Sequence, residues 1–200
     1  MDEKTIIKSP DTKREKRLPP GQHETEKWPT LQAGQIPQVE IKNWTFEIYG
    51  EVEERKKLNF KEFMDLPRVR VFSDIHCVTT WSRLDNLWEG VSSRVIAEKV
   101  SLKQTARFVL VHSVGGYSTN LRIGDFLQED VLFAIRHDDK VLEPKHGFPV
   151  RLVVPRLYFW KSAKWVRGVE FLQKEVPGFW ESRGYHRHGD PWKEQRYSDV

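Results

Sequence analysis

Cys77 is the only cysteine in the 200-residue sequence, and it lies where a short β-prone run beginning at Val71 breaks into a polar turn punctuated by tryptophans. A single thiol cannot form an internal disulfide, so this side chain either fills space or takes part in chemistry. A free cysteine commonly packs as a small buried hydrophobe. As a thiolate it is also a good protein ligand for a soft transition metal. The cysteine alone leaves both interpretations open.

A second group of residues has the types and spacing of an anion site. It comprises His146, Gly147, Arg151, Ser162, Ala163 and Lys164. The arginine stands in an otherwise apolar run, where an unpaired charge would be costly, so it requires an anion. The lysine, the histidine and the serine hydroxyl could donate to a phosphate, while the glycine and the alanine let backbone approach closely. The alternative is an edge strand whose basic residues are simply solvated.

Both stretches resemble one family. The segment from Asp74 to Ser82, followed by Trp88-Glu89-Gly90, resembles the molybdenum-ligand segment of the sulfite oxidase superfamily of molybdopterin oxidoreductases. The pattern His146-Gly147-Phe148-Pro149-Val150-Arg151-Leu152-Val153-Val154-Pro155, with Lys164-Trp165 downstream, is similar to the part of these proteins that grips the pterin and its phosphate. The resemblance covers roughly residues 28–192, and its two motifs occur in the family's order.

The resemblance implies a role for individual residues. Cys77 would bind the molybdenum of a molybdopterin cofactor, and Trp81 and Arg83 would line the substrate pocket beside it. The implied cofactor-binding positions are His146, Arg151, Ser162, Ala163, Lys164 and, with weaker alignment, Ser113. The implied activity is a two-electron oxygen-atom transfer on a small sulfite- or sulfoxide-like substrate, with an unidentified electron-transfer partner.

Departures from the family pattern bear on the substrate. The loop at residues 31–37 lacks the arginine that helps sulfite oxidases bind sulfite, and Ser82 stands where a second arginine is expected, although Arg83 adjoins it. The sequence shows neither the haem domain nor the immunoglobulin-type dimerisation domain of animal sulfite oxidases. We therefore expect a monomer similar in layout to bacterial sulfoxide-reducing members. The alternatives are a non-catalytic molybdopterin-binding or carrier domain, and a basic nucleic-acid-binding β domain.

Composition places limits on location and partners. Hydrophobic residues make up 38% and charged residues 31% of the chain, and no apolar run approaches the length of about 18 residues expected of a membrane span. The first 21 residues are charged and have no apolar core, so we expect neither a secretory signal nor a membrane partner, and a cytoplasmic protein. The net charge of +4 raises nucleic acid as a partner, but the basic residues are interspersed with 29 acidic ones and no nucleic-acid motif occurs, so none is expected.

The pattern along the chain predicts one domain over residues 26–200, preceded by a flexible tail over residues 1–25 that has too little apolar surface to repay ordering. Expected strands lie within residues 39–52, 58–60, 68–75, 107–112, 131–136 and 150–154. Short helices are expected at residues 59–64, capped by Asn59, and 92–100, capped by Ser92 or Ser93, with a helical turn at 123–127 and a loop at 115–120. The predicted fold class is α+β, with a mainly β mixed-sheet core and short helices, which is the fold of the sulfite oxidase molybdopterin-binding domain.

Overall fold

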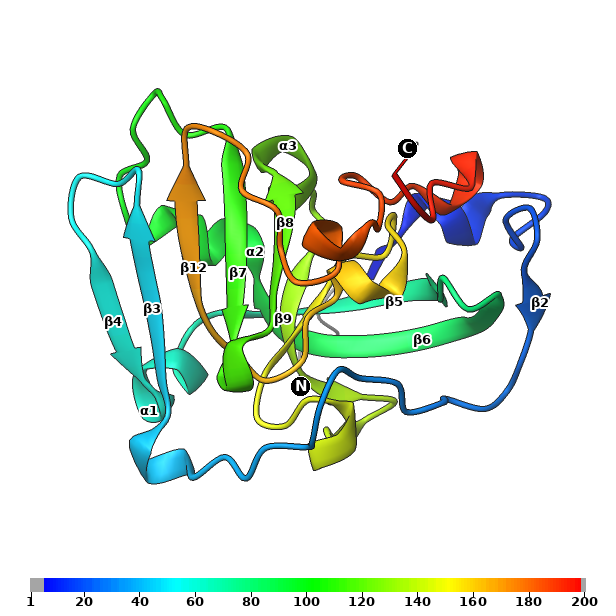
Figure 1. Cartoon of the computed structure of the whole chain (residues 1–200). Coiled ribbons are helices and arrows are strands. Elements are labelled where there is room, and N and C mark those ends of the chain that lie inside the picture. Colours follow the sequence, from blue (N-terminus) through cyan, green and yellow to red (C-terminus); the bar gives the residue numbers. More distant parts are fainter. Residues whose placement is uncertain (1–5, 199–200) are drawn as a thin grey trace.

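Two mixed β-sheets form the body of the protein in the computed structural model, which describes residues 6–198 (Figure 1). The seven-stranded sheet comprises β1 (Ile6–Lys8), β2 (His23–Glu24), β5 (Arg68–His76), β6 (Trp81–Ser92), β9 (Leu132–His137), β10 (Lys140–Val141) and β11 (Arg151–Val153). The five-stranded sheet comprises β3 (Thr45–Gly50), β4 (Lys56–Asn59), β7 (Phe108–Ser113), β8 (Ser118–Arg122) and β12 (Val166–Leu172).

The helices are short. The α-helices are α1 (Phe60–Met64), α2 (Ser93–Glu98) and α3 (Ile123–Phe126). The 3-10 turns are η1 (Pro10–Lys13), η2 (Ile41–Asn43), η3 (Val114–Gly116), η4 (Pro144–His146), η5 (Phe159–Lys161), η6 (Glu181–Arg183) and η7 (Pro191–Lys193). None of the described helices is long and apolar enough to cross a membrane. The predicted α+β class with a mainly β, mixed-sheet core is confirmed.

The predicted helix caps are also confirmed. Asn59 accepts a hydrogen bond from the backbone N–H of Glu62, whose side chain accepts one in return from the backbone of Asn59, so that α1 begins with a capping box. Ser92 caps α2 by accepting from the backbone N–H of Arg94. Both caps satisfy backbone donors that the first turn of a helix leaves free.

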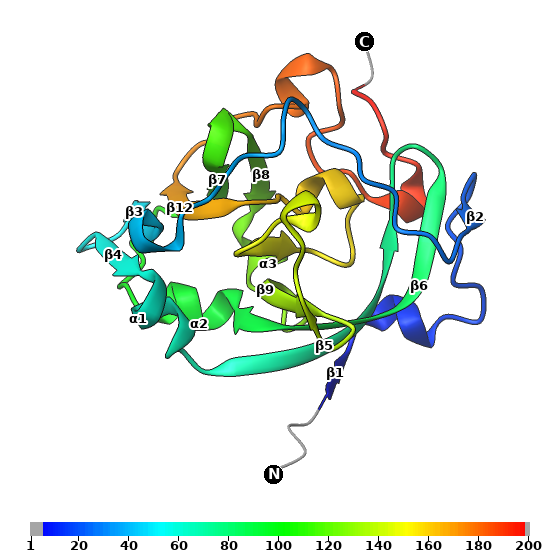
Figure 2. The same cartoon turned by 90° about the horizontal axis from the view of Figure 1, so that it is seen from below.

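The long hairpin of β5 and β6 positions Cys77. These strands pair antiparallel, and Figure 2 shows them curving around one side of the molecule. Gly90 lets β6 approach β9 closely, since a Cβ at this position would lie 2.1 Å from the Phe133 carbonyl oxygen. The polar turn expected after Cys77 is limited to residues 78–80, and the twelve-residue strand β6 follows it at once. Polar residues such as Ser82 and Asn86 occupy buried positions of β6, so its sequence does not alternate between apolar and polar residues, and the strand was not recognised from the sequence.

The two sheets pack against each other through aromatic side chains. Phe46 of β3 and Phe133 of β9 meet edge to face, with ring centroids 5.0 Å apart, and both side chains are fully buried. Sequence patterning located β3, β4, β7, β9, β11 and the turn α3 within a few residues. It predicted a loop at 115–120, where the structure has η3 followed by strand β8. The pairing partner that makes β8 a strand is β7, and this pairing is decided by the tertiary fold.

The flexible tail predicted for residues 1–25 differs from what the structure shows over residues 6–25; residues 1–5 lie outside the described part of the chain. Strand β1 pairs parallel with β5, and β2 pairs parallel with β6. The hydroxyl of Ser9, fully buried, donates to Asp130 at 2.7 Å, and Arg17 donates to both carboxylate oxygens of the buried Asp74 at 2.9 and 2.5 Å. Polar contacts with distant partners thus order a segment that has little apolar surface of its own.

Candidate active site

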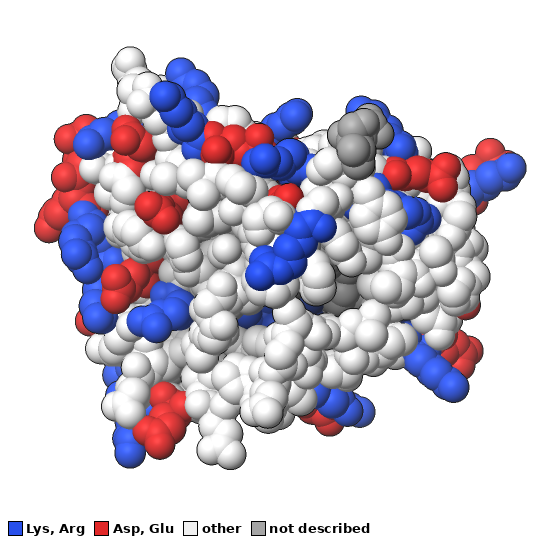
Figure 3. All heavy atoms as spheres, in the orientation of Figure 1, with Lys and Arg blue, Asp and Glu red and all other residues white. Residues whose placement is uncertain are grey.

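A cavity of about 250 Å³ opens beside the turn that joins β5 to β6. Its walls come from that turn, the loop at residues 28–33, the segment between η5 and β12, and the C-terminal segment around η6. Figure 3 shows this face of the molecule hollowed near its centre, with mostly uncharged surface beside the hollow. The cavity is lined by seven of the predicted site residues, namely Cys77, Trp81, His146, Arg151, Ser162, Ala163 and Lys164. The described lining includes no aspartate or glutamate.

Cys77 is held at the first position of the tight turn. Its backbone N–H donates to the carbonyl of Trp81 at 2.8 Å, and its carbonyl accepts from the backbone N–H of Thr80 at 3.0 Å. The thiol lies 3.1 Å from the hydroxyl of Thr79 and is only slightly exposed. Burial raises the pKa of the Cys77 thiol, an effect that the Thr79 hydrogen bond partly opposes. A thiol in this state becomes a thiolate when a metal replaces its proton.

Trp81 lies directly after this turn and lines the same end of the cavity. Its side chain is buried, and its indole N–H has no hydrogen-bond partner among the described residues. A buried donor without a partner is uncommon and costly.

Arg151 is a fully buried cation with no counter-charge among the described residues. Its guanidinium donates to the carbonyls of His146 and Ser162, both at 2.9 Å, and more weakly to its neighbour Leu152. It lies over the ring of Phe159 at 4.3 Å. Burial lowers the pKa of Arg151 to about 9, and no described carboxylate opposes the shift. Neutral carbonyls orient this charge but do not neutralise it, so the site favours a bound anion.

Two further basic groups gather around Arg151. Lys164 donates to the side-chain oxygen of Gln32 at 2.9 Å and to the carbonyl of Lys145 at 3.0 Å. Burial, and then the charge of Arg151, lower the pKa of Lys164 to about 7. The same two causes lower the pKa of His146 to about 4, and its ring stacks on Trp28 with centroids 3.7 Å apart. A bound anion would favour the protonated form of all three side chains and so raise their pKa values.

Backbone geometry at this end explains why small residues are present. Gly147 has φ +112°, and a Cβ there would lie 2.9 Å from the Cβ of Arg151 and 3.2 Å from that of Lys164. A side chain would therefore push the basic groups apart. The Ser162 hydroxyl accepts from the backbone N–H of Val154 at 2.9 Å, and the Ala163 carbonyl accepts from that of Leu152 at 2.8 Å. These bonds hold the 162–164 segment against β11.

Two predicted site residues, Arg83 and Ser113, do not line the cavity. Arg83 lies on β6 and is committed to Asn86, His137 and, at 2.8 Å, Asp138. In this arrangement Asp138 balances the charge of Arg83. Ser113 ends β7 with its hydroxyl buried and without a partner among the described residues, and it does not reach the cavity.

Sequence reasoning missed much of the aromatic wall. Trp28, Tyr117, Trp160, Trp180 and Tyr185 all line the cavity. Tyr185 stacks on Trp180 with ring centroids 4.9 Å apart and meets Trp160 edge to face at 5.1 Å. Burial raises the pKa of Tyr185, and the neighbouring Tyr197 and then Cys77 add to the shift. The sequence carries two signals for this wall: eight tryptophans, which by themselves indicate core, and the family resemblance, which includes the loop at residues 28–37 and the segment at residues 179–186.

Comparison with known proteins identifies the family. Residues 33–180 match the model of the oxidoreductase molybdopterin binding domain. The chain belongs to the sulfite oxidase family of molybdopterin-binding oxidoreductases. The predicted family and its molybdopterin cofactor are thereby confirmed, whereas the role of each residue stays a prediction.

The relatives differ in how much they share with the chain. It is 48% identical over 183 residues to the uncharacterized oxidoreductase YuiH of Bacillus subtilis, covering 91% of this chain and 92% of that protein. It is 27% identical to the protein-methionine-sulfoxide reductase catalytic subunit MsrP of Campylobacter jejuni, over 74% of this chain and 55% of that one. It is 24% identical to sulfite oxidase of Arabidopsis thaliana, over 76% of this chain and 48% of that protein. The chain thus spans about half the length of these last two relatives.

A solved structure shows the same fold. The sulfane dehydrogenase SoxCD from Paracoccus pantotrophus superimposes with a TM-score of 0.65 at 19% identity, covering 70% of this chain and 41% of that chain. At this identity the likeness concerns the fold alone.

The residues of the cavity fit the family's cofactor. A thiol suited to a soft metal lies in the same cavity as three basic side chains, and the described lining has no carboxylate to compete for them. The buried Arg151 lacks a counter-charge that a phosphate would supply. The close approach at Gly147 brings the basic groups together. These are features of this chain, and they agree with an anionic cofactor that carries a thiophilic metal.

Proposed function

We propose that Cys77 is the protein ligand of the molybdenum, and that the enzyme transfers an oxygen atom to or from a small substrate. The cofactor, once bound, supplies the oxygen-atom transfer and the exchange of two electrons with a redox partner. In this proposal Arg151, Lys164 and His146 hold the anionic end of the cofactor. The observation that carries it is the shared cavity, which presents one thiol and three basic groups without a carboxylate in its described lining.

The lining near Cys77 favours a neutral substrate, such as a sulfoxide, over sulfite. Trp81, Trp160, Trp180 and Tyr185 supply most of this wall, and Arg83 is held elsewhere by Asp138. An oxyanion needs a cation for recognition. The arginine that acts electrostatically on Cys77 is Arg196, which is not a lining residue and donates to backbone carbonyls. The relative named a protein-methionine-sulfoxide reductase is consistent with this preference.

Tyr185 would assist the reaction as a hydrogen-bond donor. Its raised pKa keeps the phenol protonated, so the hydroxyl can donate to an oxygen of the substrate near Cys77. The surrounding rings exclude water, which strengthens such a bond. Tyr185→Phe should lower kcat by about 100-fold, whereas Tyr49→Phe, on β3 and outside the cavity lining, should leave it unchanged.

Metal analysis tests the ligand assignment. Parent protein produced in a molybdenum-replete host should contain about one molybdenum per chain by mass spectrometry, and Cys77→Ser should contain little. Thr80→Ser, an exposed change in the same turn, is the matched control and should retain the metal. Retention of molybdenum by Cys77→Ser would contradict the assignment.

Turnover assays test the substrate. The loaded enzyme should reduce a small dialkyl sulfoxide with a reduced viologen dye as electron donor, with a larger kcat/KM than it shows for sulfite with ferricyanide as acceptor. A larger kcat/KM for sulfite would overturn the preference for a neutral substrate. Stoichiometric cofactor without turnover of either substrate would instead favour a carrier domain.

A further inference from the structure

The turn that presents Cys77 is held from outside by two side chains that come from opposite ends of the chain. Gln22 donates through its side-chain amide to the carbonyl oxygen of Cys77 at 3.0 Å. Arg196 donates through its guanidinium to the carbonyl oxygen of Val78 at 2.7 Å. Both side chains are partly buried where they make these bonds. Neither lines the cavity.

Gln22 links the turn to the strand that follows it. Its side-chain oxygen accepts from the hydroxyl of Ser82 on β6 at 3.2 Å, while its amide binds the Cys77 carbonyl. Ser82 in turn lies 2.8 Å from the ring nitrogen of His76, the residue before Cys77. The neighbouring backbone N–H of His23 donates to the carbonyl of Thr80 at 2.9 Å. The N-terminal segment therefore holds the turn at several points.

Arg196 connects the same turn with both terminal segments. A second guanidinium nitrogen lies 3.4 Å from the carbonyl of Pro20, and the group lies over the ring of Tyr158 at 5.1 Å. The next residue, Tyr197, forms a β-bridge with Tyr185 of the cavity wall. Figure 1 shows the N-terminal and C-terminal segments close together above the β5–β6 end. One arginine thus couples the Cys77 turn to the segment that carries Tyr185.

The turn needs such restraint because its conformation is strained at Thr80 and its Val78 carbonyl accepts a hydrogen bond from outside the turn. Thr80 adopts φ +76°, in the left-handed region that a β-branched residue rarely occupies. A residue in this conformation persists only when its surroundings enforce it. The carbonyl of Val78 accepts the Arg196 bond directly beside the thiol-bearing residue. Loss of the external donors would free the turn to relax and would redirect the thiol.

We propose that Gln22 and Arg196 are positioning residues, which fix the turn so that the Cys77 sulfur points to the place where the metal binds. The inference rests on the proposed role of Cys77 as metal ligand. It assigns to the two terminal segments a task in assembling the active site, since each contributes one donor to consecutive carbonyls of the same turn.

Alkylation of the thiol tests this proposal, because Cys77 is the only cysteine and all labelling occurs there. The thiolate is the reactive form and the charge of Arg196 lowers the pKa of Cys77 against the larger effect of burial, so the rate is measured across a range of pH, and the plateau rate at high pH is the quantity that reports exposure of the sulfur. Full-length protein produced without molybdenum is treated with iodoacetamide, and the labelling rate is followed by mass spectrometry. At this plateau Gln22→Leu should label about fivefold faster and Arg196→Met about tenfold faster than the parent, as expected when the hydrogen bond to the turn carbonyl is lost and the donor is neutral in the first case and charged in the second. Arg196→Lys, which retains a charged donor, should recover part of the parent rate.

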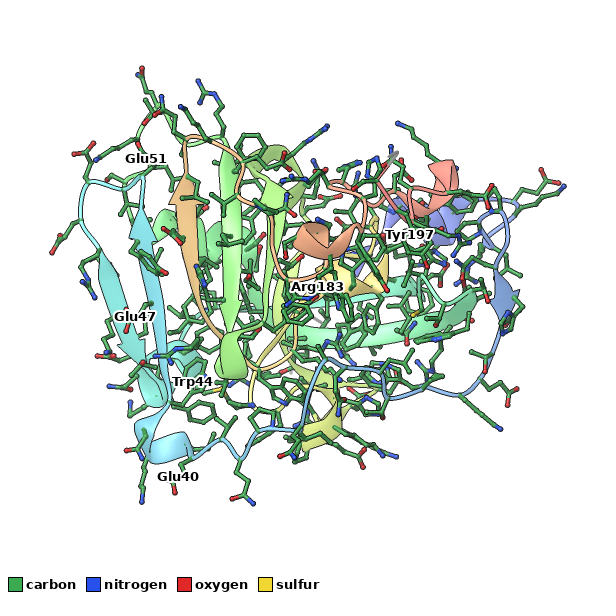
Figure 4. The ribbon with its side chains drawn as sticks, viewed as in Figure 1. Glu40, Trp44, Glu47, Glu51, Arg183 and Tyr197 are labelled. Atoms are coloured by element: carbon green, nitrogen blue, oxygen red, sulfur yellow. The ribbon has the colours of Figure 1, made fainter. Side chains whose placement is uncertain are left out.

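Matched controls use the same residue types in equivalent bonds elsewhere. Arg183 donates to the carbonyl of Phe179, and Gln128 donates to that of Gly124, each at 2.8 Å on the surface. Figure 4 shows Arg183 on η6, nearer the middle of the molecule than Tyr197. Arg183→Met and Gln128→Leu should label at the parent rate. The proposal fails if Gln22→Leu and Arg196→Met also label at the parent rate, or if the controls accelerate equally.

A second readout concerns the metal. In protein loaded with cofactor, Arg196→Met should alter the g-values of the Mo(V) electron paramagnetic resonance signal, whereas Arg183→Met should not. Unchanged g-values in Arg196→Met would overturn the positioning role. If Cys77→Ser retained molybdenum while the labelling results held, the ligand assignment would fail and the restraint of the turn would stand.

Discussion

Replacing Lys164 by methionine tests the electrostatics of the anion site most directly. Lys164 lies beside the buried Arg151, and burial together with that charge lowers its pKa from 10.5 to about 7. The unfolded chain releases this proton near pH 10.5, so between pH 7 and pH 10.5 it holds a proton that the folded chain lacks. The cofactor-free protein should therefore become less stable as the pH falls through this window, and the loss should level off below pH 7.

The size of the effect follows from the shift. Each pH unit inside the window corresponds to about 1.4 kcal/mol, so lowering the pH from 9 to 7 would remove roughly 2 kcal/mol of unfolding free energy. The amine is only partly buried and keeps its bonds to Gln32 and Lys145. Solvent screening then reduces the expected difference to about 1 kcal/mol. Methionine has no proton to lose, so this contribution disappears in Lys164→Met.

Urea unfolding of the cofactor-free protein at pH 7 and pH 9 measures the effect. The decrease in unfolding free energy from pH 9 to pH 7 should be about 1 kcal/mol smaller in Lys164→Met than in the parent. Lys145→Met is the matched control, because Lys145 is exposed and pairs with Glu143 at 2.8 Å. Added inorganic phosphate should stabilise the parent more than Lys164→Met at pH 7. Identical pH dependence in the parent and Lys164→Met would refute the reasoning.

Three further changes test the structure by urea unfolding. Glu181→Gln should cost about 3 kcal/mol, because it leaves the buried Lys161, 2.7 Å from the carboxylate, as an uncompensated charge; a loss below 1 kcal/mol would contradict this. Ser9→Ala should cost about 1 kcal/mol by removing the buried bond to Asp130, and no change would mean that the N-terminal segment adds nothing to stability. Asn59→Ala should also cost about 1 kcal/mol through the lost α1 cap, and Asn59→Asp, which keeps a capping oxygen, should restore most of it.

Several strands, the helix starts and one buried cation of this protein follow from its sequence alone. The runs at residues 68–75, 107–112 and 131–136 predicted β5, β7 and β9, because β-branched and apolar side chains favour buried strands. Asn59 and Ser92 predicted helix starts, because their side chains satisfy free backbone donors within three residues. Arg151 in an apolar strand predicted a buried cation. Each of these inferences depends on neighbours close in sequence, so no knowledge of the fold was needed.

The tertiary structure decided which residues share the cavity. Arg83 was predicted at the pocket, but Asp138, distant in sequence, binds it elsewhere. The N-terminal segment has too few apolar residues to order itself, yet Asp74 and Asp130 provide the partners that hold it. The wall contributed by Tyr185 likewise exists only after the C-terminal segment docks. A residue's type sets what it can do, whereas the partner that satisfies its charge or hydrogen bonds comes from remote parts of the chain, and only folding brings the two together.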